Sequence, residues 1–211
     1  RRRLSPGVKL MVVVKADAYG HGAEAVSRLA LAEGADCLGV LNLEEAVRLR
    51  RGGIRSRIVI LCPPLRQQAA SVAAAGVEPA VDSWGLARAL DSAAAAVRRT
   101  IPIHLDLDFG LGRWGIPRRD LAKFLGELGR RRHLKLAGIS THLDYVAGKN
   151  QIEAEEKLKQ FAAAVRSVKA KHPKALGHAA NSSILLDFPH WQLDGVRVGN
   201  LIYGINRTSK T

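Results

Sequence analysis

The sequence has few cysteines and few aromatic residues, which removes several classes of protein at the outset. Of its 211 residues only two are cysteines, and aromatic residues make up 5%. Cys37 and Cys62 stand in no CxxC pair and no metal-ligand spacing, so we expect no metal site. Each cysteine lies in an apolar, strand-like run, which predicts buried thiols in a reducing compartment.

Long apolar runs are also missing. No stretch approaches the roughly 20 apolar residues that a membrane-spanning helix needs, so we expect no membrane partner. The first residues run straight into a strand-like segment, where an export signal would place its own apolar stretch. We therefore expect a cytoplasmic protein. The sequence begins without a methionine, which leaves open a fragment or a processed product.

Negative charge is scarce, because 33 Lys and Arg residues stand against 19 Asp and Glu residues and give a net charge of +14. Such an excess raises the question of a nucleic-acid partner. The basic residues are scattered along helix-like segments, with short runs only at Arg1–Arg3 and Arg130–Arg132. Aromatic residues are too few to serve as stacking platforms between them. We interpret the charge as an Arg-rich surface and expect no nucleic-acid partner.

What the chain does contain is a regular alternation of β-rich runs and helix-like stretches. The predicted strands are Val8–Val14, Cys37–Leu41, Arg57–Leu61, Val77–Val81, Ile101–Leu107, Lys135–Thr141, Leu176–Ala180 and Gly195–Val198. The predicted helices lie near 22–33, 43–51, 65–75, 83–97, 117–131, 151–171 and 181–187. This alternation predicts a single-domain α/β protein over residues 1–211, with a (β/α)8 TIM-type barrel. A doubly wound sheet is the rival fold, but it would more often show a GxGxxG turn after the first strand.

Polar residues gather at the ends of the predicted strands, where the chemistry of such barrels collects. Alternation on the fifth strand places His104, Asp106 and Asp108 on one face and apolar residues on the other. The polar face should therefore point into the barrel. Lys15 ends the first strand after an apolar run. Apolar shelter lowers the pKa of an amine, which favours imine formation, although a lysine at a strand end can equally well extend into solvent.

The residues around Lys15 closely resemble the lysine motif of the alanine racemases, and four further motifs match that family in its own order. The matching runs are Val13-Val14-Lys15-Ala16-Asp17-Ala18-Tyr19-Gly20-His21-Gly22, Asp108-Phe109-Gly110-Leu111-Gly112-Arg113-Trp114-Gly115, Gly138-Ile139-Ser140-Thr141-His142, His178-Ala179-Ala180-Asn181-Ser182 and Val196-Arg197-Val198-Gly199. The resemblance implies an isomerase that interconverts L- and D-alanine for peptidoglycan with pyridoxal 5′-phosphate. It implies that Lys15 carries this cofactor as a Schiff base and serves as one of two catalytic bases.

The same resemblance implies a site for the cofactor phosphate and one for its ring. Phosphate is expected at Tyr19, Ser182 and the backbone around Gly199 and Asn200, and barrels commonly bind phosphate after strands seven and eight. Asn181 is expected to bind the cofactor as well. Ser182 could equally be a plain helix cap.

Arg197 is expected to face the pyridine nitrogen. Because an arginine stays protonated, that nitrogen would stay unprotonated and the ring would be a weaker electron sink. A surface salt bridge is the plainer alternative for this arginine.

Arg113 is expected beside the cofactor and the substrate carboxylate, as a catalytic residue. In the family a carboxylated lysine often braces this arginine, and Asp106 stands at that position here. We interpret Asp106 as a substitute brace, with a pairing to another barrel cation as the alternative. His142 and His178 match family histidines near the ring. We expect His142 to take part in catalysis and cofactor binding and His178 to support them.

The family's second base is a tyrosine from a β-rich C-terminal domain, which acts across a head-to-tail homodimer. Tyr19, Tyr145 and Tyr203 do not stand in that context, so we expect the barrel alone, with impaired racemisation. A racemase of broader specificity, acting on serine, lysine or arginine, remains an alternative. So does a stand-alone cofactor-binding barrel without catalysis, although the carriers with that architecture lack the run that follows Lys15.

Overall fold

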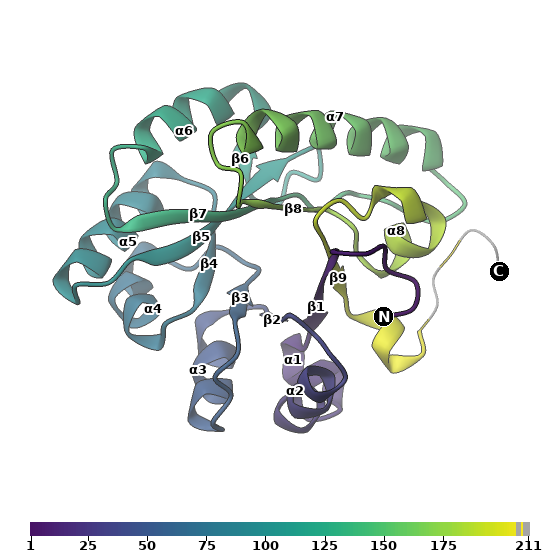
Figure 1. Cartoon of the computed structure of the whole chain (residues 1–211), viewed down its shortest axis with the longest axis horizontal. Helices are drawn as coiled ribbons and strands as arrows, with labels where there is room; N and C mark the ends of the chain where they lie inside the picture. Colours follow the sequence, from purple (N-terminus) through teal and green to yellow (C-terminus); the bar gives the residue numbers. More distant parts are fainter. Residues whose placement is uncertain (206–207, 209–211) are drawn as a thin grey trace.

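Parallel strands form a ring inside the molecule (Figure 1). The structure is a computed structural model of the chain and describes residues 1–205 and 208. The ring follows the order β8-β7-β5-β4-β3-β2-β1-β9, and each neighbouring pair is parallel. Its strands are β1 (Lys9–Val13), β2 (Cys37–Val40), β3 (Ile58–Ile60), β4 (Glu78–Val81), β5 (Ile101–Asp108), β7 (Leu134–Ser140), β8 (Leu176–His178) and β9 (Gly195–Val198).

Backbone hydrogen bonds join the two ends of this order. The amide of Asp194 donates to the carbonyl of Gly177 over 3.1 Å, and the amide of Arg197 donates to the carbonyl of Ala180 over 2.8 Å. The sheet is thereby a nearly closed barrel. The (β/α)8 barrel predicted from the sequence is confirmed, and an open doubly wound sheet is excluded.

Helices lie outside the strand ring (Figure 1). They are α1 (Lys15–Gly20), α2 (Ala23–Ala32), α3 (Leu43–Arg51), α4 (Ala69–Ala75), α5 (Trp84–Ala96), α6 (Leu121–Leu128), α7 (Gln151–Lys169) and α8 (Ser182–Asp187). Several begin at residues whose side chains accept a free amide of the first turn, as Asn42 does for Glu45 over 3.0 Å. Among the helices described, none is both long enough and apolar enough to cross a membrane.

The core lies between the strand ring and the helices. β2, β3 and β4 are buried along their whole length, as parallel strands covered by helices usually are. Side chains such as Leu49, Ile58, Leu90, Ile103 and Phe161 are almost completely inaccessible to solvent. This packing holds the strand ends in place, and those ends carry the polar residues.

Two local features differ from the sequence-based expectation. The helix predicted over 117–131 is shorter, because Pro117 belongs to the two-residue strand β6 (Ile116–Pro117), which pairs with the end of β5. A 3-10 turn follows, and α6 begins only at Leu121. The second difference is α1, which lies within the loop expected after the first strand. Its backbone is unusual and bears directly on the site.

Candidate active site

A cavity of about 340 Å³ opens where the barrel strands end. Its lining includes every residue that the sequence singled out for the site: Lys15, Tyr19, Asp106, Arg113, His142, His178, Asn181, Ser182, Arg197, Gly199 and Asn200. These residues come from distant parts of the chain, and the parallel order of the strands brings them together. The volume is within the range of small-molecule sites, about 300–1,000 Å³.

The segment after Lys15 is a left-handed turn. Ala16, Asp17, Ala18 and Tyr19 have φ values of 50, 52, 56 and 55°. This conformation costs a residue with a β-carbon roughly 1–2 kcal/mol, so surrounding contacts must hold it. The amide of Ala16 donates to Glu45 Oε1 over 2.7 Å, and the carboxylate of Asp17 accepts from the amide of the first α2 residue over 2.9 Å. Such strain is typical of functional sites.

The turn brings the Tyr19 hydroxyl against the backbone of Gly199. A β-carbon at residue 199 would lie 2.7 Å from that hydroxyl oxygen, so only glycine leaves room for it. Ser182 Oγ accepts from the amides of Gly199 and Leu201 over 3.2 and 3.3 Å. The hydroxyls of Tyr19 and Ser182 thus line the cavity beside Gly199, and both can donate to an anion. We call these two hydroxyls the anion cradle. The amide of Leu201 is an addition that the sequence did not indicate.

Arg197 is buried and anchored by four hydrogen bonds. One terminal nitrogen donates to Nδ1 and to the carbonyl oxygen of His178 over 3.1 and 3.0 Å. The other donates to the carbonyls of Thr141 and Ala179 over 2.6 and 3.3 Å. Burial lowers the pKa of Arg197 to about 10, while Asp106 opposes the shift, so the side chain is cationic at neutral pH. None of its hydrogen bonds with described residues uses Nε, and this residue lines the cavity.

The structure does not show Asp106 as a direct brace for Arg113. Among the described residues no ion pair joins them; Asp106 accepts a hydrogen bond from Ser140 Oγ over 2.8 Å, while the guanidinium of Arg113 lies 3.7 Å from the ring centre of Trp114. Burial raises the pKa of Asp106, against the effects of Arg197 and of hydrogen bonding with Ser140 and Trp114. The nearby cation that influences Asp106 most is therefore Arg197. The role of Asp106 as a brace for Arg113 stays a prediction for the site with its cofactor bound.

Two of the three cavity histidines, His142 and His178, are neutral at physiological pH. Burial lowers the pKa of His142 to about 3, and the cations Arg197, Arg113 and Lys15 add to the effect. The pKa of His178 is also far below its usual value, because this ring is completely buried and lies beside Arg197. A neutral imidazole can donate and accept one hydrogen bond each, so the partners of each ring decide its tautomer.

The alternation on β5 predicted that three polar side chains point into the barrel, and two of them line the cavity. His104 and Asp106 line the cavity, as expected. Asp108 does not, because its carboxylate accepts from the amides of Gly110 and Gly112 over 2.9 and 3.1 Å and closes the following loop. His104 was placed on the polar face by the same alternation, although no role was assigned to it. Ser140 stands in a recognised motif, yet nothing in the sequence pairs it with Asp106.

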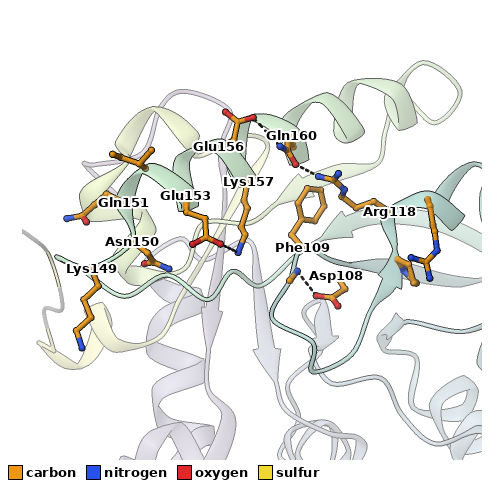
Figure 2. A pocket seen from close by; sticks show the side chains of 14 residues that line it. Asp108, Phe109, Arg118, Lys149, Asn150, Gln151, Glu153, Glu156, Lys157 and Gln160 are labelled. Atoms are coloured by element: carbon orange, nitrogen blue, oxygen red, sulfur yellow. Dashed lines mark hydrogen bonds and ion pairs between the residues drawn. The ribbon is translucent and has the colours of Figure 1, made fainter.

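A second hollow lies between the β5–β6 loop and α7, and it is larger, about 1450 Å³ (Figure 2). Some of its polar side chains are paired with one another or with neighbouring residues. Lys157 contacts Asp144 over 2.9 Å and Glu153 over 2.7 Å, and Gln160 donates to Glu156 over 3.1 Å. We call this hollow the α7 groove. Lys157, the one cation among the described residues of its lining that is not exposed, is already paired, so the smaller cavity at the strand ends is the better candidate for chemistry.

A lysine at the end of the first strand, facing an anion cradle after the last two strands, defines a class of cofactor-dependent barrel. The family profile "Alanine racemase, N-terminal domain" matches residues 1–207. The chain is 36% identical over 204 residues to the alanine racemase of Syntrophobacter fumaroxidans, and the match covers 97% of the chain and 54% of that relative.

Solved structures agree. The alanine racemase of Streptomyces coelicolor superposes with a TM-score of 0.88 at 29% identity, covering 99% of this chain and 56% of that one. The alanine racemase of Bacillus anthracis with bound L-Ala-P gives 0.86 at 30% identity, covering 99% and 54%. The chain belongs to the alanine racemase family, a family of isomerase enzymes, and corresponds to its N-terminal domain. It spans about half the length of the relatives that it matches.

Proposed function

We propose that this chain is the pyridoxal 5′-phosphate-binding barrel of a racemase that interconverts L- and D-alanine. The observation that carries the proposal is the shared cavity: Lys15, the anion cradle of Tyr19 and Ser182, and the cation Arg197 all line one space of about 340 Å³. The relatives in this family are named alanine racemases, and the match to them covers nearly the whole chain.

The residues present fit this cofactor. The hydroxyls of Tyr19 and Ser182 can donate to a phosphate, and a β-carbon at residue 199 would lie 2.7 Å from the Tyr19 hydroxyl. Arg197 offers its unused Nε–H to a ring nitrogen that accepts a hydrogen bond. When bound, the cofactor supplies an aldehyde that links to an amine and a ring that delocalises charge from the α-carbon of the substrate.

Four of the chain's own residues would then have separate roles in the reaction. Lys15 holds the cofactor and moves the α-proton on one face of the substrate. Arg113, on the wall of the cavity beside Trp114, attracts the substrate carboxylate. His142 is neutral, so it orients the ring by hydrogen bonding without adding another positive charge. Arg197 stays protonated and gives up no proton, which restrains the charge that reaches the ring.

Racemisation needs a proton at the opposite face as well. We propose that this second base is a tyrosine supplied outside the barrel, across a homodimer, and that the enzyme works in the cytoplasm to supply D-alanine for peptidoglycan. Losing one general base commonly costs about 10²–10⁴-fold in rate. The barrel by itself should therefore exchange the α-proton of alanine with solvent but racemise slowly.

The test is trapping of the cofactor on a single lysine. The purified chain is incubated with pyridoxal 5′-phosphate, reduced with borohydride and mapped by mass spectrometry. We expect the cofactor mass on Lys15 and none in Lys15→Ala, whereas the control Lys9→Ala, altered at a surface ion pair with Asp36, should still be labelled. A label on any other lysine would refute the assignment.

A parallel assay in deuterated water separates a catalytic barrel from a simple carrier. L-alanine should acquire deuterium at its α-carbon in the presence of the loaded chain and should not with Lys15→Ala. Trapping on Lys15 without any exchange would favour the carrier. Full racemase turnover would mean that a second base lies within the chain itself.

A further inference from the structure

A continuous line of hydrogen bonds crosses the barrel interior below the cavity. Arg57 donates to both carboxylate oxygens of Glu78 over 2.7 and 2.8 Å. Glu78 Oε2 lies 2.9 Å from His104 Nε2, and His104 Nδ1 lies 2.9 Å from His178 Nε2. His178 Nδ1 in turn lies 3.1 Å from a terminal nitrogen of Arg197. We call these five side chains the barrel relay.

The chemistry of its two ends determines the direction of every bond in the relay. Arg197 can only donate, so Nδ1 of His178 must accept and the proton of that neutral ring is on Nε2. His178 then donates to Nδ1 of His104, whose own proton is on Nε2. That proton is donated to Glu78, which accepts only, since it is ionised. Both rings are therefore neutral, with the proton on Nε2.

Glu78 is ionised at neutral pH. Burial alone would raise its pKa, but hydrogen bonds from Arg57 and His104 lower the pKa of Glu78 to about 2. The carboxylate is 8% exposed and His104 is 2% exposed, whereas the side chain of Arg57 is 43% exposed. The relay thus runs from a partly solvated arginine, through buried groups, to the buried arginine of the candidate active site.

The fold makes room for the central contact. A β-carbon at Gly138 of β7 would lie 2.4 Å from Nδ1 of His104, the atom that receives the bond from His178. Glu78 opens β4, His104 lies on β5, His178 ends β8 and Arg197 lies on β9. Strands on opposite sides of β7 therefore meet in the barrel interior only because Gly138 lacks a side chain.

We propose that Glu78 is a positioning residue for Arg197 and acts on it through His104 and His178. Its carboxylate requires a proton on Nε2 of His104, and the same requirement passes to His178. Nδ1 of His178 is thereby kept as an acceptor that holds the guanidinium in place. A protonated His104 would donate from Nδ1 to Nε2 of His178, shift the proton of that ring to Nδ1 and leave a donor facing Arg197. The consequence for the cofactor ring rests on the function proposed above.

The first measurement needs neither variant nor cofactor. Side-chain ¹⁵N NMR of the chain at neutral pH distinguishes the two imidazole tautomers and the imidazolium. We expect His104 and His178 both to be neutral, with the proton on Nε2. A proton on Nδ1 of either ring, or a cationic His104, would overturn the proposal.

The second measurement uses Glu78→Gln, which keeps the shape of the side chain but removes its charge. The amide can donate as well as accept, so it no longer forces the proton of His104 onto Nε2. We expect mixed tautomers at His104 and His178 and a shifted ¹⁵N signal for the side chain of Arg197. The matched control is Glu155→Gln, which alters the surface pair with His190 at 3.4 Å and should leave the relay signals unchanged. Unchanged tautomers and an unchanged Arg197 signal in Glu78→Gln would also overturn the proposal.

The third measurement is cofactor affinity, by absorbance titration. We expect Glu78→Gln to bind pyridoxal 5′-phosphate roughly tenfold more weakly, an effect of the size that outer-shell partners commonly have, and Glu78→Asp to recover part of the loss. The two proposals fail separately. Tautomers as expected without any cofactor binding would refute the proposed function and leave the relay standing, and cofactor binding with the wrong tautomers would do the reverse.

Discussion

The cavity at the strand ends and the α7 groove differ in what their polar groups bind. The groove is about four times larger, since the volumes are about 1450 and 340 Å³, yet its half-buried cation Lys157 is already paired with Asp144 and Glu153. In the cavity, the donors of Tyr19 in α1, Ser182 in α8 and Arg197 in β9 line one shared space. Unused hydrogen-bonding capacity, more than volume, is what marks a site for a ligand.

Removing a buried charge from the cavity wall should have the largest effect. Asp106→Ala leaves the hydroxyl of Ser140 without its buried acceptor and removes the carboxylate whose charge acts on Arg197. A buried donor left unsatisfied costs about 1–3 kcal/mol, and more where charged groups are involved. Denaturant unfolding should show this loss, and Asp106→Asn should retain more stability because it can still accept from Ser140. The exposed control Asp120→Ala should change little. Equal stability in Asp106→Ala and the native chain would contradict the coupling.

Filling the anion cradle comes next. A β-carbon in Gly199→Ala would displace the Tyr19 hydroxyl, which lies 2.7 Å from its position. Hydrogen bonds to charged groups are worth about 1.5–3 kcal/mol, so we expect cofactor affinity to fall by about 10- to 100-fold in an absorbance titration. The control is Gly126→Ala in α6, where a β-carbon meets no atom within 4 Å. Equal affinity in the two variants would remove the cradle from the site.

Lowering the pH below 6.5 should reduce the stability of the fold first through the buried histidines of the cavity. His142 and His178 are neutral in the folded chain but titrate near 6.5 when unfolded, so the unfolded state binds more protons as the pH falls below 6.5. Each ring then removes up to about 1.4 kcal/mol of stability per pH unit. Glu78 and Asp36, whose pKa values are lowered on folding, add to the decline as the pH approaches about 4.5, and the raised pKa of Asp106 opposes it. The slope just below pH 6.5 is therefore the part of the unfolding curves that reports on the histidines. His142→Gln should flatten that decline, and a slope equal to that of the native chain would contradict the assignment.

The smallest effect is expected in the groove. Lys157→Ala removes two ion pairs near the surface, and exposed pairs are worth about 0.2–1 kcal/mol each. We expect a loss of that order in chemical denaturation and an unchanged affinity for pyridoxal 5′-phosphate. Weaker cofactor binding in this variant would mean that the groove and the cavity are coupled, and the comparison between them would fail.

The sequence by itself determined the barrel and the membership of the site. Apolar runs such as Cys37–Leu41, separated by amphipathic stretches, can bury both faces only as parallel strands covered by helices. Because all strands of such a ring point the same way, polar residues at strand ends must meet at one rim. That is why Lys15, Ser182 and Arg197 could be placed together from the sequence, although they are far apart along the chain.

Only the tertiary structure decided how those residues are held. The residues after Lys15 have no composition that favours a left-handed turn, and the turn exists because partners such as Glu45 satisfy its amides. Asp106 pairs with Ser140, 34 residues away, and His104 meets His178 across 74 residues. Local periodicity assigns a side chain to a face of its strand. Which partner it meets there depends on the register between strands and on a single missing β-carbon at Gly138, and these follow from the packing of the whole barrel.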